Sequence, residues 1–183
     1  MKKVFYLVIF ALCALVTSCE QEELEDPIRI EVDGIYYLLH KDGTAEVTYK
    51  GYTPPQPGIQ VLATVLDIPK KVTYEGKRYK VTSIGETAFM WQHYLTSVTI
   101  PTSVKNIGEG AFSGCKGLTS FTIPNSVTTI GRSAFGDCSG LTSLTISNSL
   151  TSIEETTFFG CEGLTSIEIP GSVTTIGDRA FGS

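Results

Sequence analysis

A motif of 23 residues repeats through the second half of the chain and limits its fold more than any other feature. Phenylalanine recurs at this spacing, and three further columns of apolar residues stay in register with it. The four columns are Phe89, Phe112, Phe135, Phe158 and Phe181; Leu95, Leu118, Leu141 and Leu164; Ile100, Ile123, Ile146 and Ile169; and Ile107, Ile130, Ile153 and Ile176. A unit of this length cannot bury its own apolar face, whereas stacked copies can, so the period predicts a solenoid.

Each repeat contains a short strand and an apolar return. In "LTSFTI" (118–123), Phe121 and Ile123 alternate with polar residues, which is typical of a half-buried strand. Proline, which has no N–H for a strand ladder, follows three of the four copies, at positions 101, 124 and 170. In "VTTIGRSAF" (127–135), apolar residues stand at spacings of three, four and one, which predicts a short helical or 3₁₀ return.

Two further columns carry structural expectations. A serine recurs at 103, 126, 149 and 172, and its hydroxyl is expected to bond nearby backbone in a turn. Glu154 stands where the other repeats have Gly108, Gly131 and Gly177. If this column requires a positive φ, Glu154 carries local strain of about 1 kcal/mol or more.

The phrase "LTSFTIPNSVTTIGRSAF" and its copies resemble the BspA-like (treponemal-type) leucine-rich repeats from Val81 to the end of the chain. The resemblance implies right-handed leucine-rich-repeat coils, each with a short parallel strand. The stretch "LDIPKKVTYEGKRYKVTSIGETAF" (66–89) is similar to an opening coil, with an insertion expected to form a hairpin at Glu75-Gly76. The solenoid is therefore expected over residues 68–183, in four to five coils and incomplete at its C-terminus.

The first residues are typical of a targeting segment. Lys2 and Lys3 precede the apolar run "VFYLVIFALCALV" (4–16), which is too short to span a membrane. The following "VTSC" (16–19) resembles a bacterial lipobox, which implies a signal peptide over 1–18 and a lipidated Cys19; an ordinary signal peptide with a chance cysteine is the alternative. Residues 19–27 form an acidic tether, "CEQEELEDP", which is similar to the export signal of outer-membrane lipoproteins facing the cell exterior.

Residues 28–67 form a separate β-rich region. "IRIEVDGIYYLLHKDGTAEVTY" (28–49) alternates apolar and polar residues around the turn-forming pairs Asp33-Gly34 and Asp42-Gly43. Two or three antiparallel strands are expected, followed by a loop at "GYTPPQPG" (51–58). A cap over the first coil is the preferred interpretation, and a separate binding hairpin is the alternative.

The composition and motifs disfavour nucleic-acid binding and catalysis. The net charge is -5, and removal of the first 18 residues deletes two lysines and no acid, leaving -7, so the chain lacks the basic surface that nucleic acids require. The chain has two histidines, His40 and His93, and neither a G-x-S-x-G nor an H-E-x-x-H, P-loop or G-x-G-x-x-G motif. We expect no enzyme and no cofactor.

Three cysteines, Cys115, Cys138 and Cys161, occupy one column of the repeat. Zinc sites favour closely spaced pairs, whereas these residues stand one whole repeat apart, so no metal site is expected. Equivalent atoms of stacked strands lie about 5 Å apart, longer than the Cβ separation of about 3.8 Å in a disulfide. The preferred interpretation is a column of buried structural thiols.

The candidate ligand-binding residues fall in two groups. Polar residues alternate with the buried ones on each predicted strand, and they serve either as mutual support between neighbouring rungs or as a platform for a partner. Trp91 and Tyr94, in place of the glycines at 114 and 117, either pack against the N-terminal cap or form a binding hot spot. The strand positions are Ser97, Thr99, Ser120, Thr122, Ser143, Thr145, Ser166 and Glu168.

The resemblance implies, as the favoured function, protein binding by a non-catalytic cell-surface lipoprotein, as an adhesion module with a host or bacterial surface component as partner. Its membrane contact would be the lipid anchor alone. The alternative is a structural or assembly module, a fragment of a longer array whose open C-terminal end associates with another chain. An accessory role in polysaccharide uptake ranks third, because it would require a cleft with paired carboxylates.

Overall fold

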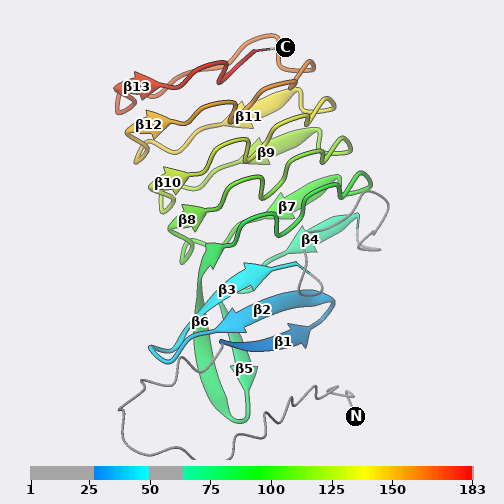
Figure 1. The fold of residues 1–183 in the computed structure, drawn as a ribbon, viewed down its shortest axis with the longest axis vertical. Helices are drawn as coiled ribbons and strands as arrows, with labels where there is room; N and C mark the ends of the chain where they lie inside the picture. Colours follow the sequence, from blue (N-terminus) through cyan, green and yellow to red (C-terminus); the bar gives the residue numbers. More distant parts are fainter. Residues whose placement is uncertain (1–26, 50–63, 183) are drawn as a thin grey trace, which may run out of the picture.

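The computed structural model describes residues 27–49 and 64–182 (Figure 1). Three sequence expectations fall wholly or mostly outside these residues: the signal segment, the acidic tether with Cys19, and the loop at 51–58. In the described residues the chain forms thirteen strands. They build an N-terminal sheet and, above it in Figure 1, a stack of repeats that ends at the C-terminus.

The N-terminal region forms the expected antiparallel strands. β1 (Ile28–Val32), β2 (Ile35–Leu39) and β3 (Thr44–Thr48) pair in sequence order. The β1–β2 turn is made by Asp33 and Gly34, whose φ angles of 51° and 82° suit a residue pair that tolerates the left-handed region. The side chains that alternate inward from β2 and β3 are buried, so this sheet contributes to the core.

The N-terminal sheet continues directly into the repeats. β5 (Lys71–Tyr74) and β6 (Lys77–Ile84) form the predicted hairpin, which turns at Glu75 and Gly76. β3 pairs with β6 in parallel, with Ala45 opposite Val81 and Val47 opposite Ile84. The N-terminal strands therefore cover the edge of the first repeat.

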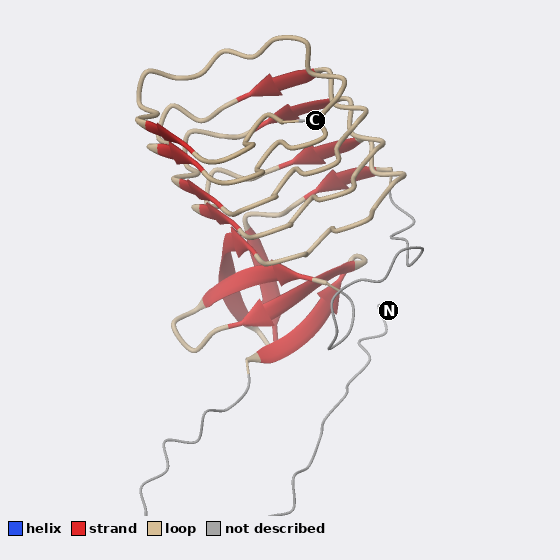
Figure 2. Ribbon diagram, turned by 45° about the horizontal axis from the view of Figure 1, so that its top comes forward, coloured by secondary structure: helices blue, strands red, loops and turns tan. Residues whose placement is uncertain are grey.

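The repeats place short parallel strands on two sides of the stack, as Figures 1 and 2 show. One side continues from β6 through β8 (Asn106–Ile107) and β10 (Thr129–Ile130), and then holds a separate pair, β12 (Ser152–Ile153) with β13 (Thr175–Ile176). The other side holds β4 (Val65–Asp67) paired with β7 (Ser97–Thr99), and β9 (Ser120–Thr122) paired with β11 (Ser143–Thr145).

The expected helical or 3₁₀ return is wrong: the described residues contain no helix (Figure 2). The reason lies in the direction of the backbone hydrogen bonds. In the return at 131–138, Ser133 N–H donates to Glu155 O and Phe135 N–H donates to Thr157 O, both in the next repeat, at 3.2 and 2.9 Å. Ser133 also adopts a φ of 51°, outside the helical region. The apolar residues thus reach the core from a series of turns.

The repeat columns form the core. The phenylalanine rings stack from one repeat to the next, with centroids 5.3–5.5 Å apart and ring planes inclined by 12–18°. The column residues of the last repeat are more exposed: Ile176 is 52% exposed and Phe181 is 39% exposed. Each repeat therefore depends on the next one to cover its apolar face.

The serine column behaves differently from the expectation. Ser149 Oγ donates to Asn125 O of the preceding repeat at 2.7 Å. The hydroxyls of Ser103, Ser126 and Ser172 are buried and lack a hydrogen-bond partner in the described part of the chain. The predicted bond to nearby turn backbone is therefore wrong for these three.

The glycine column is explained by close approach and not by a positive φ. Gly108, Gly131 and Gly177 all have ordinary φ values, so the expected backbone strain at Glu154 is wrong. A Cβ at Gly131 would lie 2.5 Å from the backbone nitrogen of Glu109 in the preceding repeat, and a Cβ at Gly108 would lie 2.6 Å from that of Glu86. Glycine therefore allows neighbouring backbones to pair on this side of the stack.

Glu154 marks the place where this pairing stops. Gly108 N–H, Gly131 N–H and Gly177 N–H each donate at 2.8 Å to the isoleucine carbonyl of the preceding repeat. β12, which directly precedes Glu154, pairs with β13 and does not pair with β10. The side chain at position 154 accounts for the break, because a Cβ at this position of the repeat would meet the neighbouring backbone.

Candidate functional site

The candidate site lies on the side of the stack that holds β4, β7, β9 and β11. We call the outward polar residues of this side the strand face. Each strand on this side has an exposed–inward–exposed pattern, so its first and third residues reach solvent. In the β9–β11 pair, Ser143 lies opposite Ser120 and Thr145 opposite Thr122. The strand face comprises Ser97, Thr99, Ser120, Thr122, Ser143, Thr145, Ser166 and Glu168, all exposed.

The hydroxyls of the strand face are not engaged with each other. Within the described residues, no side-chain hydrogen bond joins the members of this face, whereas threonines at its border do bond the backbone. Thr96 Oγ1 donates to Thr64 O at 2.8 Å, and Thr142 Oγ1 donates to Thr119 O at 3.0 Å. The free hydroxyls are therefore available to donate to and accept from a partner.

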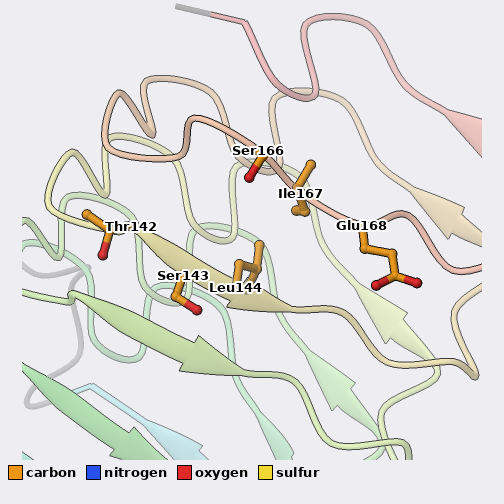
Figure 3. Close-up of a pocket in the computed structure, with 6 residues that line it drawn as sticks. All are labelled: Thr142, Ser143, Leu144, Ser166, Ile167 and Glu168. Carbon is orange, nitrogen blue, oxygen red and sulfur yellow. The ribbon is translucent and has the colours of Figure 1, made fainter.

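Ser166 and Glu168 depart from the predicted strand pattern. Residues 166–168 form no strand and do not pair with β11. A cleft of about 520 Å³ lies between the two segments, lined by Thr142, Ser143 and Leu144 on one side and by Ser166, Ile167 and Glu168 on the other (Figure 3). The repeat pattern gave no sign of this opening, because Ile167 continues the inward column of Val98, Phe121 and Leu144.

One carboxylate stands at each end of the strand face, Glu168 within it and Asp67 just beyond it. Asp67 on β4 is opposite Thr99, and Glu168 lies beyond β11. Thr99, Thr122 and Thr145 occupy the equivalent positions between them. This arrangement brings no two carboxylates together on the described strand face, although general acid–base hydrolysis of a glycoside requires such a pair.

Trp91 and Tyr94 differ in their exposure to solvent. Trp91 is half-buried and packs on Gly114 of the next repeat, where a Cβ would lie 2.5 Å from Trp91 Cε3. Trp91 thus packs against the next repeat, whereas the sequence interpretation placed it against the N-terminal cap. His93 lies beside Trp91, and its Nδ1 is 2.9 Å from Gly114 O. Tyr94 is 60% exposed.

The cysteines lie inside the stack. Cys115 and Cys138 are fully buried, Cys161 is 9% exposed, and all three are free thiols. Each Sγ donates to a phenylalanine carbonyl of the preceding repeat: Cys115 to Phe89 O at 3.1 Å, Cys138 to Phe112 O at 3.2 Å, and Cys161 to Phe135 O at 3.1 Å. An alanine in this column could not make these S–H donations.

Two of these thiols, Cys115 and Cys138, are poor nucleophiles. Burial raises the pKa of Cys115 to about 12. A side-chain hydrogen bond with Cys161, together with burial, raises the pKa of Cys138 well above its usual range. Because the thiolate is the reactive form, Cys115 and Cys138 stay protonated and inert at neutral pH.

Among the described residues, no group of three or more His, Cys, Asp or Glu side chains is arranged to hold a metal ion. The described part of the chain also contains no helix long and apolar enough to cross a membrane.

Comparison with known proteins agrees with the repeat architecture. The family model for the BspA type leucine-rich repeat region matches residues 81–183, in six copies. No curated protein sequence matches the chain significantly.

Solved structures give the same picture. A leucine-rich cell surface protein from Faecalibacterium prausnitzii is 28% identical with a TM-score of 0.55, and the match covers 86% of this chain and 52% of that protein. The pneumococcal vaccine antigen PcpA is 21% identical with a TM-score of 0.61, over 86% of this chain and 48% of that protein, which supports the fold alone. The chain thus spans about half the length of both structures.

Proposed function

The chain belongs to the family of BspA-type leucine-rich-repeat proteins, and from this premise we propose that it is a non-catalytic cell-surface protein that binds a protein partner through its strand face. The single observation that carries the proposal is the row of exposed hydroxyls that the fold leaves without internal hydrogen bonds. The similar protein from Faecalibacterium prausnitzii is described as a cell surface protein, which supports the location.

Adhesion to a host or bacterial surface component is the form of binding that we propose. The strand face offers donors and acceptors in a fixed register, with charge only at its ends, where Asp67 and Glu168 stand. Such a surface suits hydrogen bonding to a polypeptide and offers no basic groups for a nucleic acid. The repeat architecture supports the solenoid form of this platform, in which stacked coils extend one binding surface.

Anchoring through a lipid on Cys19, in the outer membrane and facing outward, completes the proposal. It rests on the sequence of residues 1–27, with its apolar run, its "VTSC" and its acidic tether. Incorporation of a labelled fatty acid into the whole chain, and its loss in Cys19→Ala, tests the anchor separately from binding.

Binding is tested with residues 19–183 carrying Cys19→Ser, on immobilised panels of matrix, plasma and bacterial-surface proteins. We expect saturable binding that is lost in the double variant Ser120→Arg and Thr122→Arg. The matched control is Thr129→Arg, on the opposite strand side, where the side chain is also exposed. Absence of saturable binding by the unmodified face, or equal loss in the control, would overturn the proposal.

A structural or assembly role is the second candidate, because one observation favours it. Phe181 and Ile176 leave apolar surface exposed at the end of the stack. Another chain could cover this surface by end-to-end association. Analytical sedimentation distinguishes the two candidates, since an assembly module would associate at micromolar concentration and a Phe181→Asp variant would not.

A further inference from the structure

The strand β11 has one edge without a strand partner. Ser143 N–H donates to Thr119 O at 3.3 Å, and Thr145 O accepts from Ile123 N–H at 3.0 Å, so the polar groups of these two residues face β9. Successive residues of a strand direct their N–H and C=O groups to opposite edges. The N–H and C=O of Leu144 therefore face residues 166–168, where no described strand pairs with β11.

Apolar side chains of the interior are partly exposed along the same edge of β11. Val98 and Phe121, which precede Leu144 in the inward column, are 9% and 3% exposed. Leu144 and Ile167 are only half-buried, and both line the cleft of about 520 Å³ (Figure 3). The cleft thus presents an unpaired backbone edge together with two partly uncovered apolar side chains.

The charge of the cleft favours a basic ligand over an acidic one. Glu168 lines the cleft with an exposed carboxylate, and the other lining side chains are Thr142, Ser143, Leu144, Ser166 and Ile167, which carry no charge. A basic side chain would be attracted to this carboxylate, and an acidic one would be repelled.

We propose that the free edge of β11 binds an extended segment of a protein partner by strand addition. The segment pairs its backbone with Leu144, places an apolar side chain between Leu144 and Ile167, and directs a lysine or arginine to Glu168. Because successive side chains of a strand point to opposite faces, the apolar and basic residues are adjacent in the segment. The inference rests on the proposed protein-binding function and assigns it a site and a ligand class.

The test uses a defined probe, the blocked and fluorescein-labelled peptide Thr-Val-Lys-Val-Lys-Val-Thr, with a second peptide that carries glutamate in place of both lysines. The protein is ¹⁵N-labelled 19–183 with Cys19→Ser. We expect saturable anisotropy with the lysine peptide, at least about tenfold weaker binding of the glutamate peptide, and slower amide exchange at Leu144 on binding.

Two variants locate the site. Leu144→Pro removes the free N–H without removing a bond to β9, and we expect it to weaken the lysine peptide by about tenfold. Val98→Pro is the matched control: Ser97 N–H donates to Thr64 O and Ile68 N–H donates to Thr99 O, so the N–H of Val98 likewise faces away from the paired strand. Glu168→Gln keeps the shape of the edge and should weaken binding of the lysine peptide while leaving the glutamate peptide unweakened.

Several results would overturn the proposal. They are protection of the Leu144 amide in the free protein, equal peptide affinity in Leu144→Pro and Val98→Pro, or a dimer that closes the edge in sedimentation. Glu168→Gln and the exchange measurement decide the matter if a proline variant fails to fold. If a panel partner binds through Ser120 and Thr122 while Leu144→Pro leaves its affinity unchanged, the proposed function stands and the edge proposal fails.

Discussion

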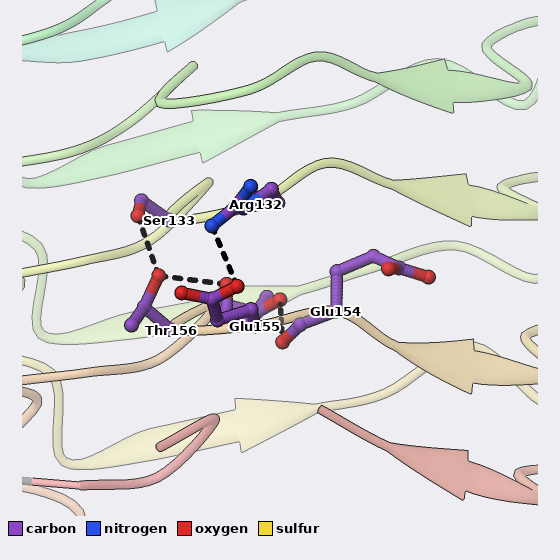
Figure 4. A network of polar contacts seen from close by, with 6 residues as sticks. Arg132, Ser133, Glu154, Glu155 and Thr156 are labelled. Carbon is purple, nitrogen blue, oxygen red and sulfur yellow. Dashed lines mark hydrogen bonds and ion pairs between the residues drawn. The ribbon is translucent and has the colours of Figure 1, made fainter. Parts of the chain in front are cut away.

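Arg132 Nη2 lies 2.5 Å from Glu155 Oε2 and joins two successive repeats at the point where their backbones stop pairing on one side of the stack (Figure 4). Ser133 Oγ and Thr156 Oγ1, 2.7 Å apart, form a second bridge beside it. Side chains thus connect the repeats next to Glu154, where β10 and β12 do not pair with each other.

The ion pair itself is expected to contribute little. The side chains of Arg132 and Glu155 are 57% and 45% exposed, so water and salt screen their attraction. We expect Arg132→Ala to lower the free energy of unfolding by less than about 1 kcal/mol, and by less still at 1 M salt. Denaturant unfolding at both salt concentrations checks this, and a larger loss would show that the guanidinium has a further structural role.

Glu154→Gly should restore pairing between β10 and β12. With the side chain removed, the N–H groups of residues 151 and 154 can donate to the carbonyls of 128 and 130, as their equivalents do in other repeats. Two new hydrogen bonds of about 1 kcal/mol each outweigh the added backbone entropy of a glycine, about 0.5–1 kcal/mol. We expect slower amide exchange at 151 and 154 and a higher Tm.

The exchange measurement is decisive for this variant. Glu154→Gln serves as the control, because it removes the charge but keeps the Cβ. If the control slows exchange as much as Glu154→Gly does, charge and not close approach explains the break.

Gly131→Ala should destabilise the stack. Its Cβ would lie 2.5 Å from the Glu109 backbone nitrogen, and backbone cannot move aside as a flexible side chain can. Overpacking of this kind costs about 1–3 kcal/mol, so we expect urea unfolding to show a decrease in the free energy of unfolding within that range. Gly171→Ala is the control, since a Cβ there meets nothing within 4 Å and the φ is ordinary, so it should be neutral or slightly stabilising.

Much of the fold follows from the period of 23 residues. The apolar columns predicted the stacked core, and the Asp-Gly and Glu-Gly pairs predicted the N-terminal hairpins. The helical return could not be excluded, because spacings of three and four residues also arise from successive turns. What decides between them is the non-glycine φ of 51° at Ser133 and the bonds to the next repeat, which local sequence does not reveal.

The site was predictable in part. Alternation along each strand placed the hydroxyls on one exposed face, as at Ser120 and Thr122. The cleft beside Leu144 was not predicted, because it depends on the separation of two repeats with the same pattern. Glu154 signalled a different irregularity, the missing pairing of β10 with β12 on the other side of the stack, and the sequence interpretation assigned it to φ and not to close approach.

Trp91 and Gly114 should be energetically coupled across two repeats. Gly114→Ala would bring a Cβ to 2.5 Å from Trp91 Cε3 and also place alanine at a φ of +73°. We expect Gly114→Ala to lower the free energy of unfolding by more than about 1 kcal/mol. Adding Trp91→Ala removes the steric clash, so the double-mutant cycle should give a coupling energy above about 0.5 kcal/mol. Gly34→Ala, at a φ of +82° with nothing within 4 Å, measures the backbone cost alone.

The thiol of Cys115 should make the stack less stable at alkaline pH. Its pKa is raised to about 12 by burial in the folded protein, whereas an unfolded cysteine titrates near about 8.5. The contribution of this thiol to the free energy of unfolding is therefore fully present below about pH 8.5, where the thiol is protonated in both the folded and the unfolded state. Above that pH the unfolded chain loses the proton first, so the free energy of unfolding falls by up to about 1.4 kcal/mol per pH unit from this group. Urea unfolding at pH 7.5 and 9.5 should show a steeper decline in the parent protein than in Cys115→Ala. Equal declines would mean that the thiol ionises alike in both states, which its burial does not allow.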